Sequence, residues 1–532
     1  MKELPSPKST PPSGAIGRGA WMALAAALLG WMFDGAEMGI FSMVGRSAVK
    51  DLMQTTDEGE IGRWFNVVIA CFLVGAAAGG VLFGWLGDRI GRVRAMTLSV
   101  LTYALFTGLC GFASNATQIG VLRFIAALGM GGEWSLGVAL VMEVWPNRSR
   151  AFMAGLIGAA ANVGYLLVGY AGIALNSILV HIKDWLLTTG LNETTVEMLT
   201  AHQGWRIMML LGTAPAFLTF LIRMFVPESE RWEKEQGEGH TTNWAARDLL
   251  GVLIGCIGPF LIVYLWAFPT TGSLEHSTVL RVLGTLIGLA IATIGFTYPV
   301  FRYLQRLNAS SAVAQPWPPV LRRMLLAACL SGIALLGTWG STQQAPSWAQ
   351  KLTDAAQQNS EPRVEMKNAK EYTQIYLAYG AIVGTIIAAV VGDWLGRRTA
   401  YCVLCALSLL SILWFYLGSA EYNAVFLWKV FLMGACTASF YGWLPLYLPE
   451  LFNTNVRATG QGFGFNFGRV LAAIGTLQTG NLIGLFNTET TVGSLTIAPG
   501  HPAACSIISA VYVIGMILIW FAPETHGKPL PE

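Results

Sequence analysis

Long apolar runs, interrupted by short polar segments, dominate the pattern of this chain. A helix needs roughly 20 mostly apolar residues to cross the hydrocarbon core of a bilayer, and charged or Pro/Gly-rich segments separate such windows. Fourteen spans are predicted, at residues 21–43, 64–84, 95–113, 117–143, 151–176, 205–226, 249–268, 280–301, 322–342, 373–391, 399–417, 424–447, 458–485 and 504–522. The pattern therefore predicts an all-α polytopic membrane protein.

The composition agrees with this class. Of the 532 residues, 54% are hydrophobic and 12% are charged, too few charges to surround a soluble core of that size. The net charge is +3 without a run of Lys or Arg, so we expect the lipid bilayer, and no nucleic acid, as a partner. The cysteines lie in apolar stretches without a second Cys pair or a His pair, so we expect no metal site.

The polar segments between the runs alternate in charge. GDRIGRVR, PNRSR and GDWLGRR carry arginines, whereas DLMQTTDEGE and LNETTVE carry no cation. Because cations concentrate in cytoplasmic loops, we expect both termini in the cytoplasm, with the chain spanning the cell (inner or plasma) membrane. The Pro- and Ser-rich residues 1–20 are typical of a disordered cytoplasmic tail.

A duplication is visible in the charged motifs. GWLGDRIGR around Asp88 recurs as VVGDWLGRR around Asp393, and Glu143 recurs as Glu450 at nearly the same separation. Such a repeat predicts two parallel six-helix units with a substrate site between them at mid-membrane, and two runs that match neither copy predict an inserted hairpin. The predicted division is a tail 1–20, a bundle 21–226, a cytoplasmic loop 227–248, the hairpin 249–301, a cytoplasmic loop 302–321, a bundle 322–522 and a cytoplasmic tail 523–532.

The ordered motifs GWLGDRIGR, RFIAALGMGGEW, PESERW, GDWLGRR and PETHGKPL resemble those of the major facilitator superfamily, particularly its sugar and organic-acid porters. The resemblance covers nearly the whole chain, and it implies the major facilitator fold and transport by alternating access. LGWMFDGAEM, GMGGEW and GDWLGRRTAY, with the inserted helix pair, look most like the bacterial sialic acid transporters. The pattern of the first span also resembles that of aromatic-acid/proton symporters.

Two acids stand in the first apolar run. Asp34 and Glu37, in WMFDGAEMGIF, lie one helical turn apart on the same face. Two neighbouring carboxylates in a partly dry cavity cannot both ionise cheaply, so the pair suits a reversible proton site. None of the histidines falls within a predicted span, which leaves carboxylates as the proton carriers. The alternative is that one acid pairs permanently with an arginine and only holds the structure.

Two further charges lie in the fourth run. Glu133 stands about 15 Å from Arg123 along a helix, near mid-membrane. Glu133 is a second candidate for proton or substrate binding, or else the partner of Arg123 or Arg469 in a buried ion pair. Arg123 resembles the fourth-span arginine that the superfamily associates with proton transfer; alternatively, its side chain only extends to the membrane surface.

Arg469 is the candidate for binding an anionic substrate. It lies about 18 Å inside its run, where a guanidinium needs an anion, and arginine binds carboxylates bidentately. A fixed internal partner such as Glu133 is the alternative. Asn162, at the repeat-equivalent position, and Asn466, in the same run as Arg469, are further polar candidates for the substrate site.

The stretch GTWGSTQQAPSW adds an aromatic and two amides to the candidates. Trp339, Gln343 and Gln344 suit a hydroxylated substrate, because amides form hydrogen bonds to hydroxyl groups beside an aromatic platform. The alternative is an interfacial anchor, since Trp is common at the ends of membrane helices.

Charged residues of the inner loops are candidates for gating. Charge pairs and helix ends there could hold the two halves together in an outward-open state, or the arginines could only set the topology. The candidates are Asp88, Arg89, Arg92, Glu143, Arg150, Asp393, Arg397, Arg398, Glu450 and Arg457. We expect Glu143 to pair with Arg150 and Glu450 with Arg457. Ala389 stands where the first copy has Gly84, so the two contacts should pack unequally.

These features predict a secondary transporter, not an enzyme, that imports a small organic anion such as sialic acid together with protons. It would need no cofactor beyond the proton gradient and would work as a monomer. A neutral-sugar porter is the alternative; a proton-driven exporter fits less well, because the fifth run lacks the Gly-Pro motif usual in such exporters. Phosphate loops and nucleophile elbows, which would indicate an enzyme, are absent from the sequence.

Overall fold

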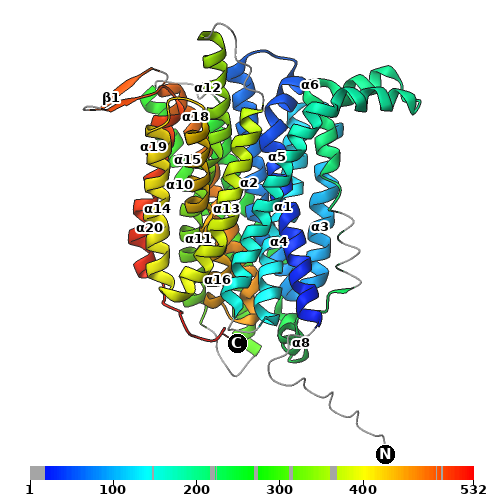
Figure 1. Ribbon diagram of the computed structural model, residues 1–532. Helices are drawn as coiled ribbons and strands as arrows, with labels where there is room; N and C mark the ends of the chain where they lie inside the picture. The colour runs from blue at the N-terminus through cyan, green and yellow to red at the C-terminus, as the bar shows by residue number, and fades with distance from the viewer. Residues whose placement is uncertain are drawn as a thin grey trace, which may run out of the picture.

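Long helices run side by side between two ends of the molecule (Figure 1). The computed structural model describes residues 18–145, 149–215, 218, 222, 225–268, 274–310, 316–359, 368–486, 488–492 and 495–531. One end carries the short helix α8 (Glu230–Gly237) and the C-terminus, and we call it the α8 end. The other end carries α12 (Ala345–Asn359), and we call it the α12 end.

The first half of the chain forms one bundle. Its helices are α1 (Arg18–Met53), α2 (Glu58–Ile90), α3 (Arg92–Leu109), α4 (Ala116–Val144), α5 (Arg150–Thr188) and α6 (Glu193–Leu211). The hairpin of α9 (Leu249–Ala267) and α10 (Leu274–Ser310) follows α8. Glycines let this hairpin close tightly, since a Cβ at Gly288 would lie 2.7 Å from the Gly258 carbonyl oxygen.

The second half forms the other bundle. Its helices are α11 (Trp317–Gly340), α12, α13 (Ala369–Trp394), α14 (Arg397–Leu417), α15 (Ala424–Ala438), α16 (Phe440–Tyr447), α17 (Arg457–Asn466), α18 (Gly468–Leu485), α19 (His501–Ser509) and α20 (Val511–Leu518). A small antiparallel ribbon of β1 (Thr490–Val492) and β2 (Leu495–Ile497) precedes α19, with Thr491 opposite Thr496.

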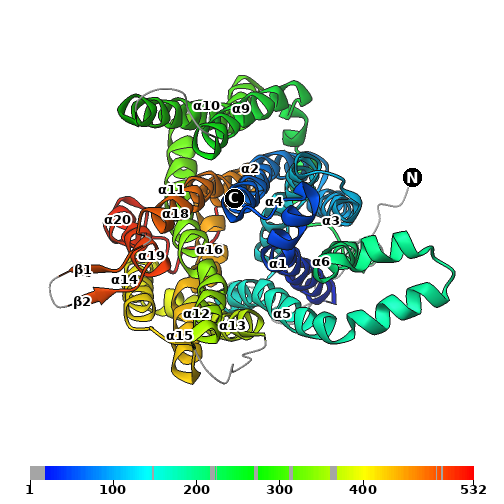
Figure 2. The same ribbon diagram turned by 90° about the horizontal axis from the view of Figure 1, so that it is seen from above.

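The two bundles face each other across the centre of the molecule (Figure 2). They meet along two seams: α5 packs against α13 and α16, and α2 packs against α17 and α18. The inserted hairpin lies at the side of the bundle, where α9 packs on α2 and α18. The hairpin therefore contacts both halves without lying between them.

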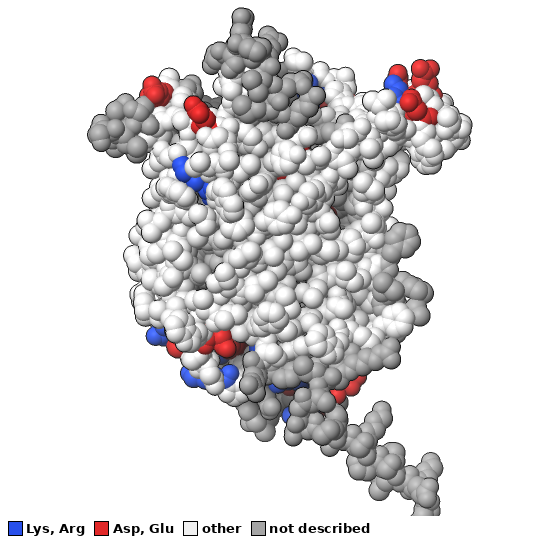
Figure 3. Space-filling model, in the orientation of Figure 1, with Lys and Arg blue, Asp and Glu red and all other residues white. Residues whose placement is uncertain are grey.

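Charged side chains gather at the two ends, and the surface between them is almost free of charge in the view of Figure 3. Among the described residues, twelve helices are long and apolar enough to cross a membrane. The expected number of fourteen is not shown. Residues 205–226 lie partly outside the described residues, and the expected span 458–485 is interrupted at Phe467 and carries the charged Arg469.

Several helices begin or end at residues other than the bounds of the predicted spans. α5 continues to Thr188, well beyond the expected end at 176. The expected span 424–447 divides into α15 and α16; α16 contains Pro445, which has no backbone N–H for a helical hydrogen bond. The expected tail 1–20 lies outside the described residues up to 17 and belongs to α1 from Arg18. The C-terminal segment packs on the bundle, with Leu530 only 4% exposed.

Candidate functional site

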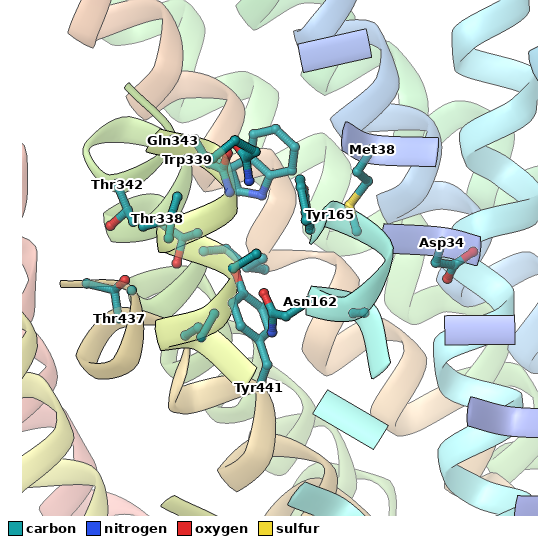
Figure 4. A pocket seen from close by; sticks show the side chains of 18 of the residues that line it. Asp34, Met38, Asn162, Tyr165, Thr338, Trp339, Thr342, Gln343, Thr437 and Tyr441 are labelled. Carbon is teal, nitrogen blue, oxygen red and sulfur yellow. The ribbon is translucent and has the colours of Figure 1, made fainter. Parts of the chain in front are cut away.

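A small cavity lies between the two bundles, roughly halfway along the helices (Figure 4). It measures about 60 Å³, enough for a few water molecules but well below a site that encloses a whole small-molecule ligand. Aromatic side chains form much of its wall, namely Trp31, Tyr165, Trp339, Tyr441 and Phe465. Polar side chains also line it, among them Asp34, Asn162, Thr338, Thr342, Gln343, Gln374, Thr437 and Arg469.

Arg469 lines this central cavity from the second half of the chain, near the start of α18. It is only 4% exposed, and its guanidinium lies over the Phe465 ring at 5.4 Å. The one hydrogen bond found for it among the described residues goes to the Met130 sulfur at 3.8 Å, a weak acceptor. No carboxylate oxygen lies within 4.0 Å of it in the described part of the chain, and the carboxyl group that acts on it most strongly is Asp34.

Asp34 lines the cavity from α1, on the side opposite most of the second-half residues in Figure 4. It is 4% exposed, and its Oδ1 has no hydrogen-bond partner among the described residues. Its closest acidic neighbour is Glu133 of α4, which is 1% exposed and also lies beside the Tyr103 hydroxyl. Neither carboxylate oxygen of Glu133 has a hydrogen bond of normal geometry. Gly30 makes room for this contact, because a Cβ there would overlap Glu133 Oε1.

Glu37 does not take part in the contact between Asp34 and Glu133, because it pairs with Arg123. Arg123 donates a hydrogen bond to Glu37 Oε1, and the Thr107 hydroxyl donates to the same oxygen at 2.9 Å. Arg123 also lies over the Phe72 ring at 4.5 Å. The expected pairing of Asp34 with Glu37 is therefore replaced by two separate contacts, Asp34 beside Glu133 and Glu37 with Arg123. Glu133 forms no ion pair with Arg123 or Arg469 among the described residues.

The other expected substrate residues divide into three groups. Asn162, Trp339 and Gln343 line the central cavity, and the Asn162 amide donates to the Gly158 carbonyl at 3.0 Å. Trp339 is 7% exposed, so it does not stand at the membrane surface as an interfacial anchor would. Gln344 lines only the next cavity towards the α12 end.

Asn466 is the one expected substrate residue that lies away from both cavities. Its amide donates to the Gly131 carbonyl at 2.7 Å, and a Cβ at Gly80 would collide with it. Asn466 therefore joins α17 to α2 and α4 in this structure, and its role in the substrate site stays a prediction. The sequence held no signal against it, since an asparagine inside an apolar run fits either role.

A second cavity, which we call the vestibule, continues towards the α12 end. It measures about 50 Å³ and shares Trp339, Gln343 and Gln374 with the central cavity. The rest of its wall comes mainly from the part of α1 after Asp34, the start of α12 and Lys370 at the start of α13. The vestibule thus extends the central cavity in one direction along the bundle.

At the α8 end, a buried cluster joins the two halves. The backbone N–H and the hydroxyl of Thr459 donate to Asp88 at 2.9 and 2.5 Å. Arg92 donates to Asp88 at 2.8 Å and to the Thr454 carbonyl at 3.0 Å. Arg457 donates to Glu143 at 3.0 Å, and both side chains are fully buried. Because Asp88, Arg92 and Glu143 belong to the first half, these bonds hold the α8 end closed.

The second repeat forms the same local cluster, but among the described residues this cluster lacks the corresponding hydrogen bonds to the other half. Arg397 pairs with Glu450 at 2.8 Å and with Asp393 at 3.4 Å, as Arg92 pairs with Glu143 and Asp88. Gly91 and Gly396 precede the two arginines with φ of 110° and 83°, a conformation that favours glycine. The Asp393 side chain is 52% exposed and contacts only its own half among the described residues.

The gating residues therefore have other partners than those expected from the sequence. Glu143 contacts Arg457 of the other half instead of Arg150, and Glu450 contacts Arg397 instead of Arg457. Arg150 acts electrostatically on Glu450. Two candidates lie outside the closure: Arg89 is exposed and covers the Trp85 ring, and Arg398 donates to the Ala522 carbonyl of its own half.

The loop glutamates of PES and PET cap the two clusters. Glu228 accepts a hydrogen bond from the Arg92 backbone N–H at 2.9 Å, and Glu524 accepts one from that of Arg397 at 3.1 Å. Burial raises the pKa of Glu228 despite these N–H donors. For Glu524, burial raises the pKa as well, but the N–H groups of Arg398, His526, Arg397 and Thr525 outweigh it and leave the pKa below its usual value.

Among the described residues, no three His, Cys, Asp or Glu side chains lie close enough together to bind one metal ion.

Comparison with known proteins identifies the family. The profile of the Major Facilitator Superfamily matches residues 23–476. The chain is 25% identical to the "Cis,cis-muconate transport protein" of Acinetobacter baylyi over 88% of this chain and 91% of that protein. It is 23% identical to the "Benzoate transport protein" of the same organism, over 87% and 84% of the two chains. The solved structure of the proton:xylose symporter XylE, bound to 6-bromo-6-deoxy-D-glucose, superimposes with a TM-score of 0.60 over 97% of this chain and 98% of that chain, at 16% identity, which shows the fold alone. The chain is a membrane transporter that belongs to the Major Facilitator Superfamily.

Proposed function

We propose that this protein imports a small organic anion together with protons, by alternating access to the central cavity. The observation that carries the proposal is Arg469: a buried guanidinium faces the cavity, with no carboxylate oxygen within 4.0 Å among the described residues. A buried charge needs a partner, and a substrate carboxylate is the partner that arginine binds best.

The walls of the central cavity suit a carboxylate with an unsaturated or ring-shaped body. Aromatic side chains such as Trp339 and Tyr441 offer flat apolar contact, while Asn162 and Gln343 offer hydrogen bonds to further oxygens. The muconate and benzoate transporters among the relatives favour a small unsaturated acid. Sialic acid, our expectation from the sequence, stays a candidate because the amides also suit a hydroxylated acid. A neutral sugar is the alternative substrate, and export is the less favoured direction.

Proton coupling is assigned to Asp34 and Glu133. Their carboxyl groups lie next to each other in a buried part of the protein, where two negative charges would repel strongly. One proton shared between them removes that repulsion. Because Asp34 also acts on Arg469, loss of the proton would change the charge beside the substrate. Glu37 and Arg123 form a neighbouring ion pair that responds to the same charges.

The gating residues act at the α8 end, which we assign to the cytoplasm because arginines dominate its loops. Both termini would then be cytoplasmic in a cell membrane. The bonds of Asp88, Arg92 and Glu143 to the second half would hold this end closed while substrate enters from the α12 end. We also propose that residues 205–226 and α17–α18 complete fourteen spans, and that one chain is the functional unit.

The test is uptake by purified protein in liposomes. The panel of labelled compounds consists of cis,cis-muconate, benzoate, sialic acid and the neutral sugar xylose, each with and without an inward proton gradient. We expect at least one of the three carboxylates to accumulate only with the gradient, and xylose to be excluded. Xylose uptake that is indifferent to the gradient, with no carboxylate uptake, would overturn the proposal.

The role of Arg469 has its own test. Arg469→Lys keeps the charge but loses the bidentate geometry, so we expect uptake of the transported carboxylate to fall about ten-fold or more while the protein stays folded. Arg323→Lys, which changes an exposed arginine that donates to the Leu451 carbonyl away from the cavity, serves as the control. Equal uptake by Arg469→Lys and wild type would remove Arg469 from the substrate site.

A further inference from the structure

Lys370 is the cation of the vestibule. Every other lining side chain of this cavity among the described residues is neutral, including Ser42, Ser347, Gln344 and Gln374. The vestibule shares part of its wall with the central cavity, so a ligand that comes from the α12 end passes Lys370 before it reaches Arg469. The sequence gave no reason to single out this lysine, which stands beside an acid in the segment NAKEY.

The partners of Lys370 leave its charge unsatisfied. Its Nζ donates one hydrogen bond, to the Met43 carbonyl of α1, at 2.6 Å. An ammonium group has three N–H donors, and no carboxylate oxygen lies within 4.0 Å of Nζ in the described part of the chain. The charged groups that act on it are Glu371, its neighbour along α13, and Arg46 on α1. A half-buried ammonium with donors to spare is therefore exposed to the contents of the vestibule.

We propose that Lys370 forms a second anion site, in the vestibule, that takes the substrate carboxylate before it passes to Arg469. This inference rests on the proposed function, because it names an earlier binding site for the same ligand. The ligand class is an organic carboxylate small enough to fit beside Ser42 and Ser347. The Ser347 hydroxyl can donate to its second oxygen, whereas the Ser42 hydroxyl donates to the Met38 carbonyl at 3.1 Å.

The bond to Met43 links this site to gating. Lys370 belongs to the second half and Met43 to the first, so their hydrogen bond crosses the seam between the halves near the α12 end. A carboxylate that binds Nζ replaces the Met43 carbonyl with a stronger, charged acceptor. Arrival of the anion thus compensates the loss of a bond that must break when the α12 end opens further.

The test measures initial uptake rates of the three panel carboxylates by wild type, Lys370→Gln and Lys370→Arg in liposomes. We expect Lys370→Gln to raise KM about five- to ten-fold, because one charge-assisted contact is lost, and to change kcat less than about two-fold. Lys370→Arg restores the charge and should return KM to near the wild-type value. Lys351→Gln, which removes an exposed lysine of α12 outside the vestibule, is the matched control and should leave KM unchanged.

Salt supplies a second readout. When ionic strength rises from roughly 0.01 M to 0.15 M, the Debye length falls from about 30 Å to about 8 Å, so capture by a partly exposed cation weakens. We expect KM to rise with salt for wild type and Lys351→Gln, and to respond much less for Lys370→Gln. Lys370→Met is a second neutral variant, should Lys370→Gln fail to fold.

Two outcomes would overturn the vestibular site. One is a wild-type KM and salt response in folded Lys370→Gln or Lys370→Met. The other is a loss of kcat without a change of KM, which would mean that Lys370 only links the two halves and does not bind the substrate. Either result leaves the proposed function standing if Arg469→Lys still lowers uptake about ten-fold or more, whereas normal uptake by Arg469→Lys counts against the proposed function itself.

Discussion

Asp34 and Arg469 face one cavity from opposite halves of the chain, although they are 435 positions apart in the sequence (469 − 34). Each is a charge that the membrane interior would reject without a partner. Asp34 has Glu133 beside it, and Arg469 has an open cavity. In the proposed function, Asp34 therefore binds a proton and Arg469 an anion.

The first residue-scale prediction concerns Asp34. Asp34→Asn cannot release a proton, so gradient-driven accumulation should be lost, while exchange of labelled for unlabelled carboxylate across the membrane should continue. Counterflow and gradient-driven uptake in the same liposomes separate the two activities. Accumulation at the wild-type level by Asp34→Asn would show that the proton travels elsewhere.

The second residue-scale prediction concerns the loop glutamates. The pKa of Glu524 lies below its usual value in the folded protein, so its ionised form stabilises the fold at neutral pH, and this contribution is lost as pH falls through the folded pKa. Because solvent screens this partly exposed group, Glu524→Gln should lower stability by about 0.5–1 kcal/mol at pH near 7 and by less in acid. Thermal unfolding in detergent across pH measures the difference.

Glu228→Gln is the matched control for this prediction. The pKa of Glu228 is raised, so its ionised form adds no such stability, and its replacement should cost less at neutral pH. A loss of stability that is equal for both variants and independent of pH would contradict the assignment.

Single residues also show how much of the candidate site can be predicted from the sequence. Asp34, Arg469 and Asn162 were predicted from charge or repeat position inside apolar runs, and the cavity brings them together. Spacing along α1 suggested Glu37 as the partner of Asp34, but a residue from α4 takes that place. Contacts between helices depend on packing that no spacing along one helix reveals.

At the scale of the elements, two close helix contacts decide how the halves meet. A Cβ at Gly84 of α2 would lie 2.9 Å from the Ala458 carbonyl oxygen and from Thr459 Cα on α17. On the other seam, Ala389 of α13 already carries a Cβ, and the glycine stands opposite it, at Gly155 of α5. The two contacts therefore differ: at one seam the glycine lies on α2, whereas at the other it lies on α5, opposite Ala389 of α13.

Gly84→Val should therefore keep α2 and α17 apart and favour opening at the α8 end. We expect transport to fall about ten-fold or more, because a side chain without room against backbone forces a shift of the helix. Ala389→Gly only removes a methyl group and should retain most activity. Accessibility of a cysteine placed at Thr459 to a soluble reagent would rise with Gly84→Val; unchanged accessibility and transport would contradict this account.

The repeat, the inserted hairpin and most helices followed from hydrophobic runs and motif order. The interruption at Phe467 did not, because α17 and α18 together form one run by composition. The long extension of α5 to Thr188 was missed for a different reason: polar residues such as Lys183 and Asp184 end an apolar run without ending a helix.

On the scale of the whole molecule, the α8 end is held by buried bonds between the halves, and the vestibule leads to the α12 end. In the proposed function, this combination is the state that receives ligand from the α12 end. Opening of the α8 end must break the Glu143–Arg457 ion pair and the other hydrogen bonds between the halves in the same cluster.

Glu143→Gln should shift the protein towards a state open at the α8 end, because Arg457 loses its carboxylate partner. Removal of one partner from a buried ion pair costs about 3–5 kcal/mol, enough to reverse a small preference between two states. Distances between spin labels at the α8 end would lengthen in Glu143→Gln. Asp393→Asn, in the exposed position of the second cluster, is the control and should leave them unchanged.

The central claim is that one carboxylate and protons cross together through the cavity of Arg469 and Asp34. The most direct measurement records internal pH and labelled cis,cis-muconate, benzoate or sialic acid in the same liposomes. The account predicts that entry of the transported carboxylate acidifies the interior in wild type, and that neither event follows a proton gradient in Asp34→Asn. Carboxylate entry without proton entry, or proton-independent uptake of xylose in place of a carboxylate, would contradict it.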